Sequence, residues 1–198
     1  MFIFHDVDLI PSKELLTNYT SVPTAGPCHI ASVWNRYNNN DKYFGGIVSF
    51  TRSQFEQING FPNNFWGWGG EDDEMQKRVE AAQLTPTKPA AGSIRDLEEM
   101  SLAQKLKFLR DRREQKCGVK WEVLATHDTT WRVNGLKSLE YAVIQDAWLD
   151  ADCATRSDGD SAGAHHAASG ADRVVRKVTV DVRFNKDEFD AQCNLPVV

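Results

Sequence analysis

The 198-residue sequence has no long apolar run, and this absence limits the classes of protein to which it can belong. No stretch approaches the ~20 consecutive apolar residues that a membrane-spanning helix needs. The opening residues, Met1 to Asp6, contain no basic segment before the first acidic side chain, so they do not resemble a signal peptide. The sequence therefore predicts a chain without its own membrane segment.

Positive charge is also in short supply. The 23 Lys and Arg residues are outnumbered by 28 Asp and Glu residues, which gives a formal net charge of -5. A nucleic-acid partner is therefore not expected, because such proteins neutralise phosphates with a basic surface. Hydrophobic residues at 41% and charged residues at 26% exclude a wholly disordered chain and favour a soluble globular protein.

Cysteine is sparse and scattered. Cys28, Cys117, Cys153 and Cys193 form no Cys-x-x-Cys pair, which argues against a zinc ribbon or a thioredoxin-type site. Their spacing leaves open whether they form disulfides in an oxidising compartment. We expect unpaired, partly buried thiols.

Strand-like and helix-like segments alternate along the chain, which predicts an α/β fold. Apolar runs indicate strands within residues 2–10, 43–50, 84–89, 139–144 and 174–182. Helix-start signals follow Thr51 and Ser101, and a third helix is expected to open on four consecutive acids, Glu71 to Glu74.

The domain organisation is expected to be simple. Residues 156–172 consist almost wholly of Ser, Gly, Ala, Asp and His, a composition that predicts a disordered insertion. Strand-like sequence resumes directly after it. Residues 1–150 are therefore expected to form the main part of one domain, and residues 173–198 a terminal strand and tail of the same domain.

Two segments carry residues suited to chemistry. Asp6 and Asp8 are two positions apart at the end of a predicted strand, so both carboxylates can project from one face and hold Mn²⁺ or Mg²⁺. An Asp-x-Asp triplet is common, however, and its usual interpretation is a solvated strand end. The second segment, Phe65 to Asp73, joins a Trp- and Gly-rich loop to three acids, a combination suited to stacking on sugar rings and to general-base catalysis. Its alternative interpretation is a structural aromatic loop before a dipole-favoured helix start.

Together, the segments Phe4–Pro11, Tyr43–Gly46 and Asn59–Asp73 resemble the β-1,4-galactosyltransferase family, glycosyltransferase family 7. The resemblance is dense over residues 2–80 and returns weakly at residues 134–141. It implies a GT-A-type fold, and it implies that this chain corresponds to the acceptor-side, catalytic half of that fold without its N-terminal half.

The resemblance also implies roles for individual residues. Asp8 would bind Mn²⁺ and, through it, the diphosphate of a UDP-sugar, while Asp6, Tyr43, Gly46 and Trp68 would bind the donor. Asp72 would be the catalytic base that deprotonates the 4-hydroxyl group of a glycan acceptor for an inverting attack. The residues implied to bind the acceptor are Glu71, Asp73 and Trp66.

The chain departs from the family where a Met and a His usually complete the metal site. The corresponding stretch, Gly92 to Met100, contains no His, and Asp96 and Glu99 are expected to substitute as oxygen ligands. The alternative is that both acids merely precede the helix capped by Ser101.

The function that the resemblance implies is metal-dependent transfer of galactose, or a related hexose, from a UDP-sugar. The resemblance also implies that the intact enzyme is located in the Golgi. Two other classes of function stay open. One is a non-catalytic carbohydrate-binding remnant of such an enzyme, and the other is a structural protein built on a metal site.

Overall fold

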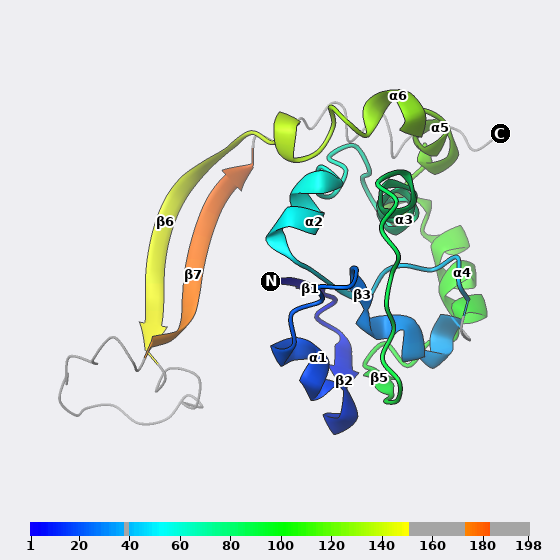
Figure 1. The fold of residues 1–198 in the computed structure, drawn as a ribbon. Coiled ribbons are helices and arrows are strands. Elements are labelled where there is room, and N and C mark those ends of the chain that lie inside the picture. Colours follow the sequence, from blue (N-terminus) through cyan, green and yellow to red (C-terminus); the bar gives the residue numbers. More distant parts are fainter. Residues whose placement is uncertain (38–39, 151–172, 183–198) are drawn as a thin grey trace, which may run out of the picture. The chain divides into compact units, whose positions relative to one another are not determined.

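The computed structural model describes residues 1–37, 40–150 and 173–182. It divides into two compact units, whose described parts are residues 1–37 and 40–139 for the first and residues 140–150 and 173–182 for the second. Figure 1 shows the first unit as a mixed body of helices and short strands, and the second as a long two-stranded hairpin. The predicted boundaries at residues 150 and 173 stay predictions, and the predicted insertion at 156–172 lies outside the described residues.

Helices and strands alternate along the first unit, as the α/β prediction requires. Its α-helices are α1 (Leu16–Thr20), α2 (Arg52–Gln57), α3 (Glu71–Ala81), α4 (Leu102–Asp111), α5 (Lys120–Ala125) and α6 (His127–Thr130). Its strands are β1 (Phe2–His5), β2 (Leu9–Pro11), β3 (Cys28–His29), β4 (Ile47–Phe50) and β5 (Ile94–Asp96). Short 3-10 helices cover residues 13–15, 30–33, 35–37, 113–115 and 136–138.

The strand expected over residues 2–10 is in fact two strands. β1 ends at His5 and β2 begins at Leu9, and the residues between them form a turn that is closed by the Leu9 amide donating to the Asp6 carbonyl at 3.2 Å. Asp6 and Asp8 therefore sit in a turn, and the strand alternation used to place them on one face does not apply.

Two small antiparallel sheets organise the first unit. In one, the strand order is β1-β4-β3, with Phe2 opposite Phe50 and Cys28 opposite Ser49. The other pairs β2 with β5, so that Leu9 lies opposite Asp96. This second pairing brings the segment after β5 next to the turn that holds Asp8.

The predicted helix starts are confirmed. The side chains of Thr51 and Ser101 each accept a hydrogen bond from the backbone amide three residues on, and their own backbone amides donate to the glutamine side chain at that position, which completes a capping box. α3 opens on the four acids, as predicted, and its inward residues Met75 and Val79 are fully buried.

One predicted strand is wrong. Residues 84–89 form no strand, and only Thr87 makes an isolated bridge, to Cys28. The strand in this part of the chain is β5, which the sequence analysis missed because three residues carry too little periodicity to stand out.

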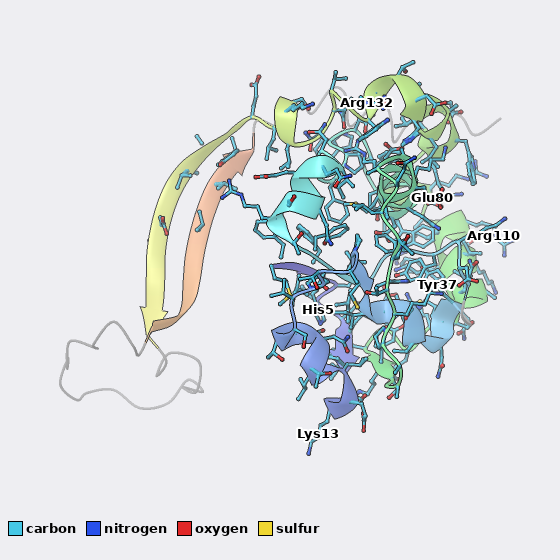
Figure 2. All side chains as sticks on the ribbon, viewed as in Figure 1. His5, Lys13, Tyr37, Glu80, Arg110 and Arg132 are labelled. Carbon is cyan, nitrogen blue, oxygen red and sulfur yellow. The ribbon has the colours of Figure 1, made fainter. Side chains whose placement is uncertain are left out.

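The core of the first unit lies on the two faces of β4. Ile47 packs into one cluster with Leu9, Leu15 and Ile30, while Val48 and Phe50 pack into a second cluster against α2 and α3. The side chains fill the space between the ribbons of this unit (Figure 2). β4 therefore anchors the chain entering the site at Gly45 and Gly46.

The second unit is an antiparallel pair of β6 (Tyr141–Asp150) and β7 (Arg173–Val182). Both strands extend the segments predicted from the sequence. Across the described ranges of the chain, no helix combines the length and apolar character needed to cross a membrane.

Candidate active site

A cavity of about 440 Å³ in the first unit collects most of the residues that the sequence predicted for the site. Its wall is formed by the β1–β2 turn, the segment before β4, the Trp-Gly loop with the first turn of α3, and side chains from residues 98–120. The predicted residues in the wall are Asp6, Asp8, Tyr43, Trp68, Glu71, Asp72 and Asp73. Four predicted residues lie outside the wall, namely Gly46, Trp66, Asp96 and Glu99.

Asp72 is the most perturbed acid of this wall. Burial, and after it the neighbouring Glu71 carboxylate, raise the pKa of Asp72 well above its ordinary value. Lys120 opposes this effect only weakly. A buried carboxyl group with a raised pKa holds a proton more tightly than an exposed one, which is the property required of a general base working near neutral pH.

Gly45 makes room for the Asp72 carboxyl group. A Cβ atom at residue 45 would lie 1.9 Å from Asp72 Oδ2, so any other residue there would displace the acid. The carbonyl of Gly45 accepts a hydrogen bond from His29 Nε2 at 3.0 Å, and burial lowers the pKa of His29 to about 4. Neutral His29 thus holds the backbone against which Asp72 rests.

Glu71 has an unused hydrogen-bonding atom. Its Oε2 is buried and has no hydrogen-bond partner among the residues that the structure describes. Burial also raises the pKa of Glu71. A buried carboxylate oxygen without a partner is costly to a fold, so this atom is available to a ligand group that donates a hydrogen bond.

Aromatic rings form the opposite part of the wall. Tyr43 stacks on Tyr37, with ring centroids 3.6 Å apart and planes within 8° of parallel, and Trp34 meets Tyr43 edge-on. Burial raises the pKa of Tyr37 to about 12 and raises that of Tyr43 further, so both phenols keep their protons. Tyr37 was not predicted as a site residue because nothing in its sequence neighbourhood distinguishes it.

The Trp-Gly loop is held by the segment after α4. The Trp68 amide donates to the Gln115 carbonyl at 2.7 Å, and the Cys117 amide donates to the Trp68 carbonyl at 3.1 Å. Gly67, with φ of 83°, lies so close to Lys116 that a Cβ atom would come within 2.8 Å of its carbonyl carbon. Trp68 lines the cavity, whereas Trp66 is not part of its wall.

Gly46 acts on the site through the backbone. Its carbonyl accepts a hydrogen bond from the Asp6 amide at 2.8 Å, which fixes the start of the acidic turn. Burial of the carboxyl group and the Asp8 carboxylate together raise the pKa of Asp6.

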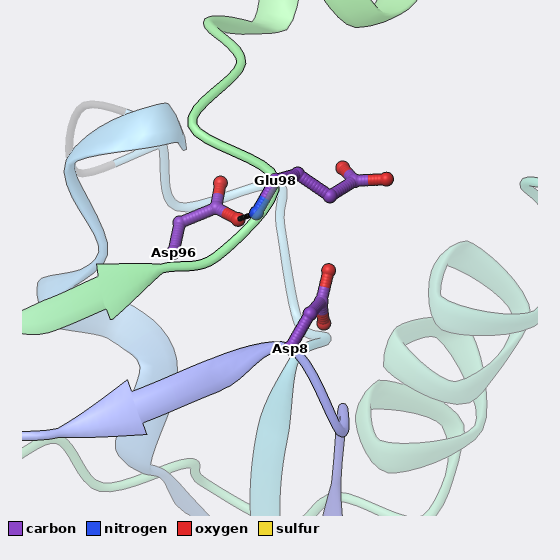
Figure 3. Close-up of side chains that lie close together, drawn as sticks. All are labelled: Asp8, Asp96 and Glu98. Carbon is purple, nitrogen blue, oxygen red and sulfur yellow. Dashed lines mark hydrogen bonds between the residues drawn. The ribbon is translucent and has the colours of Figure 1, made fainter.

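Three acids lie close together, as Figure 3 shows, and two of them, Asp8 and Glu98, also line the cavity. Asp8, Asp96 and Glu98 each offer a carboxylate oxygen, and these oxygens lie within 4.8 Å of one another. The Leu97 amide donates to the Asp8 carbonyl at 2.8 Å, and the Glu98 amide donates to Asp96 Oδ1 at 2.8 Å, so the backbone fixes all three. Carboxylate oxygens are the ligands preferred by Mn²⁺ and Mg²⁺, and this donor set fits such an ion.

Two of these three acids, Asp8 and Asp96, are among the metal ligands expected from the sequence, whereas the third acid of the cluster is Glu98 and not the expected Glu99. Glu99 is exposed, has a positive φ of 53° and lies outside the cluster, whereas the adjacent Glu98 points into it. Two consecutive glutamates are indistinguishable by sequence pattern. The turn that follows β5 decides which of them faces Asp8.

Basic side chains complete the wall. Lys120 Nζ lies 2.7 Å from Asp73 Oδ2, and Arg36 and Lys105 pair with the three-acid cluster. None of these cations was predicted from the sequence, because they come from separate segments with no motif. A second cavity of about 490 Å³ shares Lys42 and Asp73 with the first and includes Trp121, whose side chain is mostly exposed.

Comparison with known proteins agrees with this arrangement. A family model described as the N-terminal domain of galactosyltransferase matches residues 26–102. Beta-1,4-galactosyltransferase 4 of Rattus norvegicus is 34% identical over 151 residues, which cover 72% of this chain and 40% of the rat protein. Beta-1,4-galactosyltransferase 3 of Homo sapiens is 30% identical over 143 residues, covering 71% of this chain and 34% of the human protein. The chain thus spans about 40% or less of the length of these curated relatives.

Solved structures share the fold. A crystal structure of a Drosophila β-1,4-galactosyltransferase 7 mutant in complex with manganese, UDP-Gal and xylobiose matches with a TM-score of 0.63 and 25% sequence identity. The match covers 98% of this chain and 71% of the Drosophila chain. A second structure, of the catalytic domain of the same enzyme with xylobiose, matches to the same extent. With its acid-headed helix, Trp-Gly loop and acidic turn in one cavity, the chain belongs to the β-1,4-galactosyltransferase family and has its GT-A-type fold.

Proposed function

We propose that this chain catalyses inverting, metal-dependent transfer of galactose, or a related hexose, from a UDP-sugar to the 4-hydroxyl group of an acceptor sugar. The observation that carries the proposal is the pair Asp72 and Glu71. One is a buried acid with a raised pKa and the other has a buried oxygen without a partner, and both face the cavity. Such a pair suits an acceptor hydroxyl group that must be both bound and deprotonated.

Asp72 is the proposed base. Its ionised carboxylate takes the proton of the acceptor 4-hydroxyl group as that oxygen forms a bond to the anomeric carbon of the donor. The bond from the anomeric carbon to the diphosphate oxygen breaks, and its electron pair leaves with UDP. Attack from the side opposite the leaving group inverts the anomeric configuration.

The acceptor is proposed to lie against the first turn of α3. Glu71 Oε2 accepts a hydrogen bond from an acceptor hydroxyl group, and Asp73, held by Lys120, borders the same space. No direct acceptor contact is proposed for Trp66, because it lies outside the wall of the cavity. The neighbouring cavity, which includes Trp121, supports an acceptor that extends beyond the first cavity, for example a chain of more than one sugar.

The donor is proposed to lie between the acidic turn and the aromatic wall. Tyr43, stiffened by its stack on Tyr37, borders the donor sugar, and Trp68 covers it from the Trp-Gly loop. Asp6, fixed by Gly46, faces the nucleotide. Each of these contacts comes from a residue whose backbone is held by hydrogen bonds or close packing.

Asp8 and Asp96, with Glu98 in place of the predicted Glu99, are the proposed ligands of Mn²⁺. A divalent ion held by these three acids would supply positive charge to offset the negative charge of the diphosphate leaving group. By its family, the intact enzyme is proposed to act in the Golgi, with a UDP-sugar and a glycan acceptor as its partners.

The test is a transfer assay with the purified chain, UDP-galactose, Mn²⁺ and the p-nitrophenyl β-glycosides of N-acetylglucosamine, glucose and xylose as acceptors. We expect transfer to at least one acceptor, and we expect Asp72→Asn to lower kcat by about 10²–10⁴-fold, the usual contribution of a general base. Asp111→Asn, an exposed acid outside the cavity, is the matched control and should retain full activity.

The same assay separates the enzyme from a non-catalytic carbohydrate-binding remnant. A remnant would bind an acceptor glycoside without affinity for UDP and without product. Equal activity of the Asp72→Asn variant and the parent chain would remove Asp72 from the mechanism.

A further inference from the structure

The proposed metal ligands already carry positively charged partners. Arg36 Nη2 contacts Asp96 Oδ2 and lies 2.9 Å from Glu98 Oε2, so one guanidinium nitrogen bridges two of the three acids. Lys105 Nζ lies 2.5 Å from Glu98 Oε1. The side chains of Arg36 and Lys105 are 5% and 13% exposed, and those of Asp96 and Glu98 are 11% and 29% exposed, so these ion pairs are partly shielded from water.

A divalent ion and these cations compete for the same oxygens. The acids of the cluster offer ligand atoms within 4.8 Å of one another, and Arg36 rests on two of those groups. Like charges held against one carboxylate repel strongly where solvent is excluded. Glu98 and Asp96 can therefore keep their full ion pairs with Arg36 and Lys105, or they can bind the divalent ion, but they cannot do both at once.

We propose that Arg36 and Lys105 are resident counter-ions of this cluster, which Asp96 and Glu98 exchange for a divalent cation, and that the two released side chains then bind the diphosphate of the donor. The exchange rests on these ion pairs and on the proposed metal ligands. The second step rests on the proposed function, because it needs a sugar-nucleotide donor.

The geometry of Arg36 suits a short movement of this kind. Its Nε donates to the Met100 carbonyl at 3.1 Å, and its guanidinium lies 4.6 Å from the centre of the Trp34 ring. These two contacts do not involve the acids, so they hold the guanidinium at the cavity while Nη2 changes partner. A planar guanidinium with several donors matches phosphate oxygens well.

Lys105 is attached differently. It extends from the first turns of α4 on a flexible stem and lines the cavity together with Asp8, Arg36 and Glu98. Once Glu98 binds the ion, the ammonium group is left facing the cavity without its carboxylate partner. An anionic diphosphate there would restore a charge-assisted hydrogen bond.

The exchange is tested by titrating Mn²⁺ into the full chain without nucleotide and following the electron paramagnetic resonance signal of free Mn²⁺. Lys105→Met removes a competing charge, so we expect it to bind Mn²⁺ more tightly, by about threefold or more. Lys105→Arg keeps the charge, and Lys107→Met removes an exposed charge on the same helix, so both controls should bind Mn²⁺ within about twofold of the parent chain.

Calorimetric titration of UDP at saturating Mn²⁺ tests the second step. Here we expect the opposite sign, with Lys105→Met weakening UDP binding by about tenfold and Lys105→Arg restoring most of it. If Lys105 had only a structural role, Lys105→Met would weaken the binding of both Mn²⁺ and UDP. Thermal unfolding of each variant checks that α4 is intact, and Lys105→Gln serves as a second neutral variant should the methionine variant fold poorly.

The outcomes are separable. Unchanged or weaker Mn²⁺ binding in folded neutral variants of Lys105 would overturn the exchange. UDP binding that is unaffected by loss of the Lys105 charge would overturn the diphosphate step. A parent chain that binds Mn²⁺ but no UDP would refute the proposed function together with that second step, while the Mn²⁺ series would still decide the exchange.

Discussion

At the scale of single residues, Asp72 affects stability and chemistry in opposite directions. Its pKa is raised in the folded protein, so the folded protein binds the proton more tightly than the unfolded chain does. The group therefore supports folding below the ordinary pKa of aspartate and costs stability as the pH rises through the raised value. At neutral pH the buried Asp72 carboxyl group therefore lowers the stability of the folded protein.

Asp72→Asn should consequently raise the free energy of unfolding near pH 7, by about 1 kcal/mol or more, because the amide has no charge to desolvate. Urea unfolding of the variant and the parent chain measures the difference. The gain should shrink at about pH 4, where the folded carboxyl group is protonated. A variant that is less stable than the parent at neutral pH would contradict this description of Asp72.

Glu71 sets part of the pKa of the base. Its carboxylate is the largest cause after burial of the raised pKa of Asp72. For a catalytic base, kcat/KM falls as the pH drops below the pKa of the base in the free enzyme. The acidic limb of the pH profile should therefore lie above the ordinary range of an aspartate.

Glu71→Gln should move that acidic limb to lower pH, because it removes a neighbouring negative charge. It should also raise KM through loss of the buried acceptor contact. The measurement is kcat/KM for a glycoside acceptor over about pH 4–9, with Asp111→Asn as the control. An acidic limb at the same pH in Glu71→Gln and the parent chain would show that Asp72 does not control it.

At the scale of elements, α3 is held in place by a buried charge network. Glu74 and Arg78 are 2% and 1% exposed and form an i,i+4 pair with a distance of 2.9 Å between Arg78 Nε and Glu74 Oε1. His127 Nδ1 lies 3.0 Å from both oxygens of Glu74, and Arg78 Nη1 donates to the Gly60 carbonyl at 3.0 Å. The network thus ties the helix that bears Asp72 to α6 and to the start of the Trp-Gly loop.

Arg78→Gln should destabilise the protein by about 3–5 kcal/mol, because it leaves the Glu74 carboxylate buried without its charged partner. The chain offers a matched control in α2, where Arg52 and Glu56 form the same i,i+4 pair with side chains 80% and 55% exposed. Arg52→Gln should cost less than about 1 kcal/mol. Denaturant unfolding of both variants measures the contrast, and equal losses would refute the role of burial.

Sequence reasoning succeeded for elements whose signals are local. The capping residues Thr51 and Ser101 and the acidic opening of α3 need only their own neighbours, and all three helices start where predicted. β5 was missed, because a strand of three residues is defined by its pairing with β2, more than 80 positions earlier in the chain. The break between β1 and β2 was missed because an apolar pattern continues across the turn.

The site shows the same division. Asp8 and the acids of α3 belong to recognisable motifs, and the structure brings them to one cavity. Glu98, Arg36 and Lys105 come from three unrelated segments, and only the β2–β5 pairing and the cap of α4 bring them together. A single sequence contains no local pattern from which contacts between such distant segments can be predicted.

At the scale of the whole molecule, a divalent ion should couple the acidic cluster to overall stability. An ion that binds only the folded chain raises the free energy of unfolding by about 2.7 kcal/mol when its free concentration is a hundred times its Kd. Mn²⁺ should therefore raise the melting temperature of the parent chain, and a chelator should reverse the shift. Asp8→Asn should lose the shift, whereas Asp111→Asn should keep it; an equal shift in both variants would place the ion elsewhere.

The central claim is that the cavity joins a donor bound at the acidic turn to an acceptor deprotonated by Asp72. The most direct test is nuclear magnetic resonance of the product made by the purified chain from UDP-galactose, whose galactose is α-linked, and a glycoside acceptor. The account predicts a galactoside with a β linkage to the 4-position of the acceptor, formed with Mn²⁺ and formed at least about a hundredfold more slowly by Asp72→Asn. An α-linked product, or release of free galactose without transfer, would contradict it.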